Sequence, residues 1–183
     1  MGANMFGFGK KRVLQKETEK SVQRFQAMSK LEIDDIWNID DKNNLVIAMF
    51  MYISDKCDYG KNLTFLTSTE RTFYLCQEFE SEINNGGFSQ FYFNSSGNYC
   101  YETPKALNEI GAMHTSKIVE KANALFGYIL PNDKKEREIL LDELVTDEMN
   151  EKLDSLDREF YEYKDNLTEL NYAYLLVYKT DFT

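Results

Sequence analysis

The sequence contains few of the residues that build disulfide frameworks, zinc sites or turn-rich sheets. Its 183 residues include 2 prolines, 9 glycines, 3 cysteines and 1 histidine. The cysteines Cys57, Cys76 and Cys100 form no CxxC pair, and the lone His114 supplies no second soft ligand. We therefore expect no disulfide framework and no structural metal site, but buried free thiols in a reducing cytoplasm. The scarcity of proline and glycine favours helices over a β-sandwich.

The sequence also lacks a long hydrophobic run. The N-terminal stretch MGANMFGFGKKR has no apolar core of the length that an export signal requires. The longest apolar run, LVIAMFMYI at 45–53, is far shorter than the roughly 20 residues that cross a bilayer. We expect no membrane association, and we interpret this run as a helix buried on all sides.

Positive charge is scarce outside the first thirty residues. Residues 1–30 hold seven Lys/Arg and two Glu, a net charge of +5. Residues 31–183 hold 14 basic and 29 acidic residues, a net charge of −15. Such a body repels nucleic acid, because nucleic-acid binding depends on neutralising phosphates. The charge instead suits a basic protein partner or simple solubility.

The length and the apolar periodicity predict an all-α fold, a single-domain bundle of several helices. We expect a flexible tail at 1–12, N-terminal helices within 13–60 that pack on the main domain, and the main helical domain at 61–183. A connection containing Trp37 is expected at 31–42. The predicted helices span 13–30, 43–56, 68–83, 88–93, 103–112, 116–126, 133–145, 147–163 and 167–179.

The strongest helix signal follows Thr67. Thr67 or Ser68 caps a helix with Glu70 in its first turn, and its apolar face is Phe73, Cys76, Phe79 and Ile83. The sequence Asn84-Asn85-Gly86-Gly87 ends it, because Asn and Gly tolerate the left-handed backbone that closes a helix. With the short segment 88–93, this predicts a helix–NNGG–helix corner. A second amphipathic helix has its apolar seam at Met149, Leu153, Leu156, Phe160 and Tyr163.

No pattern of catalytic residues stands out. His114, the one histidine, lies between two predicted helices, where a surface or capping role is more usual than base catalysis. The sequence has no G-x-S-x-G and no phosphate-binding glycine loop. Asp142, Glu143, Asp147 and Glu148 lack the spacing of a calcium loop and fit a solvated helix face better. We therefore assign no catalytic residue, no metal and no cofactor.

The segment Glu82–Gly97, EINNGGFSQFYFNSSG, is the most unusual part of the chain. Its amides and hydroxyls surround an aromatic run and would either satisfy helix ends or line a small pocket. Gly87 could also precede a helix N-terminus, whose free amides attract anions. The residues concerned are Asn84, Asn85, Gly86, Gly87, Phe88, Gln90, Asn94, Ser95, Ser96 and Gly97.

This segment resembles the NNGGF…NSSG signature of a bacterial family of unknown-function domains, the DNA-mimic protein family. The later residues Glu102, Ala106-Leu107, Ile110–Ala112 and Leu153–Asp157 with Phe160 are similar too, so the resemblance covers roughly 66–180. It implies an all-α fold, no known enzymatic activity, dimerisation, and acidic side chains arrayed like DNA phosphates. The N-terminal 60 residues are not covered.

Mimicry would depend on the charge pattern of the second half. Residues 147–165 carry eight carboxylates and three basic residues, a net −5. On a helix roughly 28 Å long this is one net charge per roughly 5–6 Å, against about one per 1.7 Å in duplex DNA. Several acidic elements or two subunits would have to converge on one face. The candidate partner-binding residues are Asp142, Glu143, Asp147, Glu148, Glu151, Asp154, Asp157 and Glu162.

Three hypotheses follow from these observations. The first is a non-enzymatic acidic interaction protein, a DNA mimic that occupies the DNA-binding surface of a basic partner and does not itself bind nucleic acid. The alternative is a small-molecule-binding protein or unrecognised enzyme that uses the polar cluster Asn84–Ser96. A third is a plain acidic scaffold whose charge serves solubility. On the first hypothesis, the signature identifies the family while the carboxylates carry the function.

Overall fold

A computed structural model describes residues 23, 26–127 and 129–183 of the chain. Within these residues every regular element is an α- or 3-10 helix, which confirms the all-α class. The predicted tail at 1–12 and most of the predicted helix at 13–30 lie outside the described residues. The elements are α2 (Ile33–Ile36), α3 (Lys42–Lys56), η1 (Leu63–Phe65), α4 (Ser68–Phe93), η2 (Ser95–Tyr99), α5 (Thr103–Glu109), α6 (Met113–Ala124), α7 (Lys134–Leu144), α8 (Asp147–Phe160), α9 (Leu167–Val177) and η3 (Lys179–Asp181).

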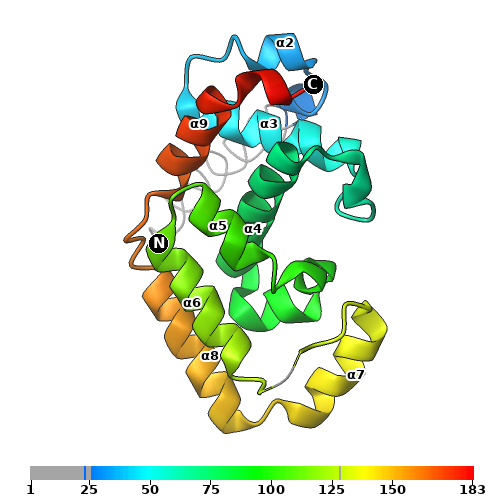
Figure 1. Cartoon of the computed structure of the whole chain (residues 1–183), viewed down its shortest axis with the longest axis vertical. Coiled ribbons are helices and arrows are strands. Elements are labelled where there is room, and N and C mark those ends of the chain that lie inside the picture. Colours follow the sequence, from blue (N-terminus) through cyan, green and yellow to red (C-terminus); the bar gives the residue numbers. More distant parts are fainter. Residues whose placement is uncertain (1–22, 24–25, 128) are drawn as a thin grey trace, which may run out of the picture.

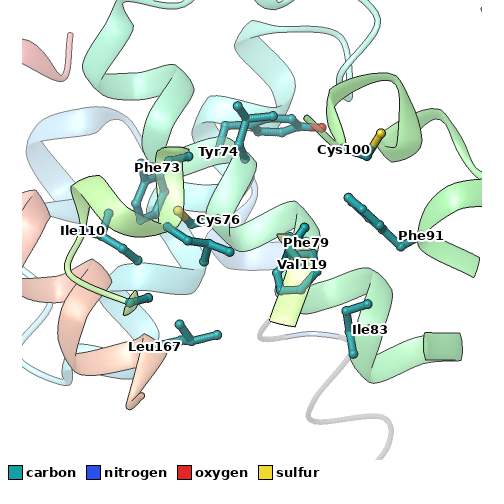
Figure 2. Packing of buried hydrophobic residues seen from close by; sticks show 14 of the residues in the cluster. Phe73, Tyr74, Cys76, Phe79, Ile83, Phe91, Cys100, Ile110, Val119 and Leu167 are labelled. Atoms are coloured by element: carbon teal, nitrogen blue, oxygen red, sulfur yellow. The ribbon is translucent and has the colours of Figure 1, made fainter. Parts of the chain in front are cut away.

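Helix α4 lies in the middle of the molecule and contacts α3, α5, α7, α8 and α9 (Figure 1). It begins as predicted: the Thr67 side chain accepts from Glu70 N, and the Glu70 carboxylate accepts from Thr67 N at 2.9 Å. This reciprocal cap satisfies two amides that the helix itself leaves free. The predicted apolar face, from Phe73 to Ile83, is fully buried and points into the core (Figure 2).

Helices α2, α3 and α9 pack at one end of the long axis (Figure 1). Helix α3 begins where the sequence predicts, because Asp41 Oδ1 accepts from Asn44 N at 2.9 Å. The expectation of a plain connection at 31–42 is wrong, since the short helix α2 interrupts it. The apolar side chain of Ile36 explains this helix, because it is fully buried.

Helices α7 and α8 lie at the opposite end of the long axis, and α6 runs beside α8 (Figure 1). Each begins at a side-chain cap: Asp133 accepts from Glu136 N, and Thr146 accepts from Met149 N. Helix α7 ends at Leu144 and α8 begins at Asp147, so only two residues join them. This places their acidic residues at one end of the molecule.

Three predicted helix boundaries are wrong. The pair Thr103-Pro104 predicts a helix capped by Thr103, but Thr103 is already the first residue of α5, Glu102 precedes it, and the Thr103 hydroxyl donates to Tyr99 O at 2.9 Å. Helix α6 starts at Met113, so His114 lies in its first turn and not between helices. Helix α8 ends at Phe160, and Tyr163 lies beyond it with a left-handed φ of +46° that no helix continues through.

Candidate functional site

The acidic stretch, which we define as Asp142–Asp154, is the densest cluster of negative charge in the second half of the chain. Its thirteen residues hold six carboxylates and one lysine, a net charge of −5. All six carboxylate side chains are exposed. Two of them, Asp147 and Glu148, lie in the first turn of α8, where negative charge stabilises the helix through its dipole.

Three carboxylates of the acidic stretch form one row. Asp147, Glu151 and Asp154 are spaced by four and three residues, so they lie on the same face of α8. Within the described residues none of the three has an ion-pair partner. By contrast Lys152 pairs with Glu148 at 2.8 Å and lowers the pKa of that carboxyl. The row therefore presents net negative charge to solvent.

The other two predicted α8-region carboxylates have different surroundings. Asp157 is half-buried, and its Oδ1 accepts from Phe88 N at 2.8 Å. Burial raises the pKa of Asp157, and the bond from Phe88 works in the opposite direction. Glu162 lies past the end of α8 and pairs with Lys164 at 2.9 Å, which lowers the pKa of Glu162. Neither residue extends the row on α8.

Asp157 is the anion at the start of the second part of α4. The backbone at Gly86 and Gly87 is not helical, with φ of −164° and +71°, and it divides α4 into two parts. The amide of Phe88 then opens the second part and donates to the Asp157 carboxylate. A methyl group at position 87 would collide with that carboxylate. Glycine is therefore required at position 87 for two reasons, its left-handed φ and its contact with α8.

The amides of the signature bind one glutamate across this kink. Gln90 Nε2 donates to the Glu82 carboxylate at 2.6 Å, and Asn94 Nδ2 donates to the same carboxylate at 3.0 Å. Asn84 exchanges hydrogen bonds with the Tyr163 hydroxyl at 2.7 and 3.0 Å. Asn85 and Ser95 are exposed. The described contacts of Gln90 and Asn94 thus hold the backbone around Gly86 and Gly87.

A buried arginine closes the end of α4, a role that the sequence analysis did not predict. Arg137 on α7 is fully buried; its Nε donates to Tyr92 O at 2.7 Å and one terminal nitrogen donates to Asn94 O at 2.7 Å. The other terminal nitrogen donates to the carbonyls of Pro131 and Asn132. The carbonyls of Tyr92 and Asn94 lie at or just past the α4 C-terminus, where a cation is favoured.

Gly97 makes room for this arginine. A methyl group at position 97 would lie 2.8 Å from Arg137 Nε and 2.6 Å from Tyr92 O. The last glycine of the signature is therefore explained by packing. The only local hint of a buried cation was an arginine three residues before a leucine pair on α7, which is too common a pattern to be informative.

His114 lies beside an existing ion pair. Its Nε2 is 3.7 Å from Glu159 Oε1, and Lys121 Nζ donates to the same oxygen at 2.9 Å. In the described part of the chain, no group of three or more His, Cys, Asp or Glu side chains is placed to hold a metal ion. None of the helices described here is both long and apolar enough to span a membrane.

Comparison with known proteins gives one match. Residues 64–178, which are 115 of the 183 residues, match the family described as DMP19-like protein. No curated protein and no solved structure matches the chain. The matched range includes α4, the kink, Arg137 and the whole acidic stretch, and it leaves out α2 and α3.

Proposed function

The chain belongs to the DMP19-like protein family, and from this membership and its surface charge we propose that it is a DNA mimic. On this proposal its acidic stretch occupies the DNA-binding surface of a basic partner protein. The family is not a known enzyme family, and the proposal accordingly assigns no catalytic residue, metal or cofactor. The cysteines Cys57, Cys76 and Cys100 are all free. Free thiols fit a reducing compartment, so we place the binding of the basic partner to this chain in the cytoplasm.

One observation carries the proposal: the spacing of charge along the first two turns of α8. From Asp147 to Asp154 four carboxylates and Lys152 give a net charge of −3. At 1.5 Å per residue these eight residues span about 12 Å, which is one net charge per about 4 Å, against one per about 3.4 Å of helix axis for one DNA strand. The density averaged over the longer range 147–165 is lower, because the basic residues Arg158 and Lys164 follow the row.

A single row imitates one strand only. Duplex DNA carries about one charge per 1.7 Å, more than twice the charge density of this part of α8. Asp142 and Glu143 at the end of α7 add two charges beside it. We propose that a second copy of the chain supplies a second row, so that the active species is a homodimer. Sedimentation velocity tests this part separately: a monomer at micromolar concentration would contradict it.

The partner-binding proposal is tested with the full chain immobilised in cell extract at low salt. We expect it to capture proteins that bind duplex DNA and to release them when duplex DNA is added, because both would compete for one basic surface. Raising the salt concentration should weaken the complex steeply. Captured proteins that duplex DNA does not displace would contradict the proposal.

A pair of charge-matched variants locates the surface. Asp147→Asn/Glu151→Gln/Asp154→Asn removes the row on α8, and Glu32→Gln/Asp34→Asn/Asp35→Asn removes three exposed carboxylates at α2, at the opposite end of the molecule (Figure 1). We expect the first variant to weaken binding about tenfold and the second to leave it unchanged, since each exposed charge contributes roughly 0.5 kcal/mol. Equal weakening by both would mean nonspecific attraction.

A further inference from the structure

A small cavity opens where the second part of α4 meets α7 and α8, and we call it the α7–α8 pocket. Its volume is about 140 Å³. Sites for whole small-molecule ligands are larger, roughly 300–1,000 Å³. An apolar cavity of about 150 Å³ holds one molecule of the size of benzene. The α7–α8 pocket therefore has space for a single side chain.

The base of the pocket is apolar. Its lining includes Leu141, Leu153 and Phe126, which are all buried. The Phe126 ring packs edge to face on the ring of Tyr92, with 4.7 Å between the ring centroids. The Tyr92 hydroxyl donates to Asn123 Oδ1 at 2.7 Å and is therefore already engaged. The base thus offers aliphatic and aromatic surface to an occupant.

The rim of the pocket carries an exposed ring and an unpaired carboxylate. Phe93 lines the pocket from α4 and is 44% exposed, although Phe91 and Tyr92 beside it are buried. Asp142 lines it from α7, is exposed, and has no ion-pair partner in the described part of the chain. None of the described residues of the lining is Lys, Arg or His. The side chain that fits this rim has an apolar stem and a cationic head.

The pocket lies on one flank of the row on α8. Asn150 lines the pocket and is exposed. It follows Asp147 by three residues and precedes Asp154 by four, so its side chain lies next to both carboxylates on the helix surface. A protein that binds along the row therefore also covers the mouth of the pocket.

We propose that the α7–α8 pocket binds one arginine side chain of the basic partner. The stem of the arginine covers the apolar base, and its guanidinium group stacks on Phe93 and donates to the Asp142 carboxylate. Arginine fits better than lysine, because a planar guanidinium stacks on rings, binds a carboxylate through two parallel hydrogen bonds and is more weakly hydrated than an ammonium group.

This proposal rests on the proposed function, because it names a residue that the basic partner contributes. The row alone attracts any cationic surface, and salt screens that attraction. A pocket that prefers arginine over lysine distinguishes among partners of equal charge. Because its contacts are partly desolvated, this preference should persist at salt concentrations that weaken binding to the row.

Two peptides of equal charge test the occupant on the full chain. The probes are the pentapeptides KKRKK and KKKKK, both acetylated and amidated. Methyl NMR spectra follow binding at Val145 and Leu153, which line the pocket. We expect KKRKK to shift both signals to saturation and to bind about fivefold more tightly than KKKKK. Equal affinities, or no shift at these two methyl positions, would overturn the proposal.

A pair of identical substitutions locates the contact. Ser89→Leu adds an aliphatic side chain to the lining, one turn before Phe93, and should abolish the preference for KKRKK by filling the pocket. Ser155→Leu is the control, because Ser155 lies on the opposite flank of the row, one turn after Glu151, and does not line the pocket. Both serines are exposed, so both variants should fold like the parent.

Neither substitution changes the charge, so both variants should bind KKKKK as the parent does. A preference for KKRKK that survives Ser89→Leu, or that Ser155→Leu also abolishes, would overturn the proposal. Capture from cell extract separates this result from the proposed function. Captured proteins that duplex DNA displaces, with equal binding of the two peptides, would overturn the pocket proposal alone. Captured proteins that resist duplex DNA, with KKRKK still preferred, would overturn the proposed function alone.

Discussion

The signature Glu82–Gly97 and the acidic stretch Asp142–Asp154 are both rich in polar side chains, yet they use them in opposite ways. In the signature, the Glu82 carboxylate accepts from Gln90 and Asn94, and Phe88 N donates to Asp157. In the acidic stretch the carboxylates are exposed, and Glu148 is the one with an ion pair among the described residues.

The difference teaches that the segment that identifies the family and the segment proposed to bind the partner are under different physical constraints. Signature residues are fixed by backbone geometry and by contacts in the core, so a change there should cost stability. The carboxylates of the acidic stretch are exposed, so on the proposed function a change to them should cost binding. We expect the effect of a substitution on the free energy of unfolding to decrease from the buried arginine at the end of α4 to the exposed carboxylates of α8.

The largest effect is expected at the arginine that closes α4. Arg137→Met leaves the buried carbonyl of Tyr92 and the carbonyl of Asn94 without their donors, and the free energy of unfolding should fall by about 3–5 kcal/mol. Lys135→Met, on the exposed side of the same helix, should change it by less than about 0.5 kcal/mol. Urea unfolding measures both. Similar losses of stability for the two variants would show that the hydrogen bonds from Arg137 to Tyr92 and Asn94 do not stabilise the end of α4.

The second effect concerns the kink. Gly87→Ala should destabilise the protein by about 3 kcal/mol, since it meets both a left-handed φ and the Asp157 carboxylate. Gly127→Ala is the matched control, with a φ of +70° but open space around it, and should cost about 1 kcal/mol. The difference between the two midpoints of thermal unfolding isolates the contact with α8. Equal losses would mean that the backbone alone fixes glycine at position 87.

The half-buried carboxylate of Glu78 and an exposed carboxylate should respond differently to pH. Burial, together with Glu82, raises the pKa of Glu78 from 4.5 to about 7, so between these values the folded state binds more protons than the unfolded state. Stability from this group therefore falls as pH rises through that window. Glu78→Gln should flatten the decline and add about 1–2 kcal/mol at pH 8.

Glu151→Gln is the control for this pH series, because its carboxylate is exposed. Urea titrations at pH 5, 6, 7 and 8 give four free energies of unfolding for each protein, and their change with pH is compared between the parent and the two variants. If Glu78→Gln follows the parent at every pH, the half-buried carboxylates of α4 behave like those of the acidic stretch, and the contrast drawn above disappears at this position.

The smallest effect on stability is expected in the acidic stretch. Asp147→Asn/Glu151→Gln/Asp154→Asn should alter the free energy of unfolding by no more than about 0.5 kcal/mol per residue, because none of the three has an ion-pair partner in the described part of the chain. The same variant is expected to weaken partner binding about tenfold, as stated above for the proposed function. A large loss of stability would show that these side chains serve the fold.

The elements that could be predicted from sequence are those that local chemistry determines. The reciprocal cap of Thr67 and Glu70 and the apolar face of α4 depend on residues a few positions apart, and both were predicted correctly. The starts of α3 and α7, predicted at 43 and 133, lie at Lys42 and Lys134, next to the local caps Asp41 and Asp133. The start of α6 was missed because it has no side-chain cap of its own; Asp165 accepts from Thr115 N instead, at 2.7 Å.

The contacts that could not be predicted join residues far apart in the chain. Asp157 and Phe88 are 69 positions apart, and Arg137 and Tyr92 are 45 positions apart. A charged residue on an amphipathic helix looks the same in sequence whether it faces solvent or a distant carbonyl. The sequence therefore grouped Asp157 with the acidic surface, although its carboxylate is engaged by the backbone of α4.

The hydrogen bond from Phe88 N to the Asp157 carboxylate cannot form until late in synthesis of the chain. The ribosome makes the second part of α4 before it makes the carboxylate that caps it, and 69 residues separate the two. At about 5–20 residues per second, this gap lasts roughly 3–14 s. During that interval Phe88, Phe91 and Tyr92, all buried in the finished protein, lack the helix that covers them. We therefore expect these aromatic side chains to stay exposed on the nascent chain until α8 emerges.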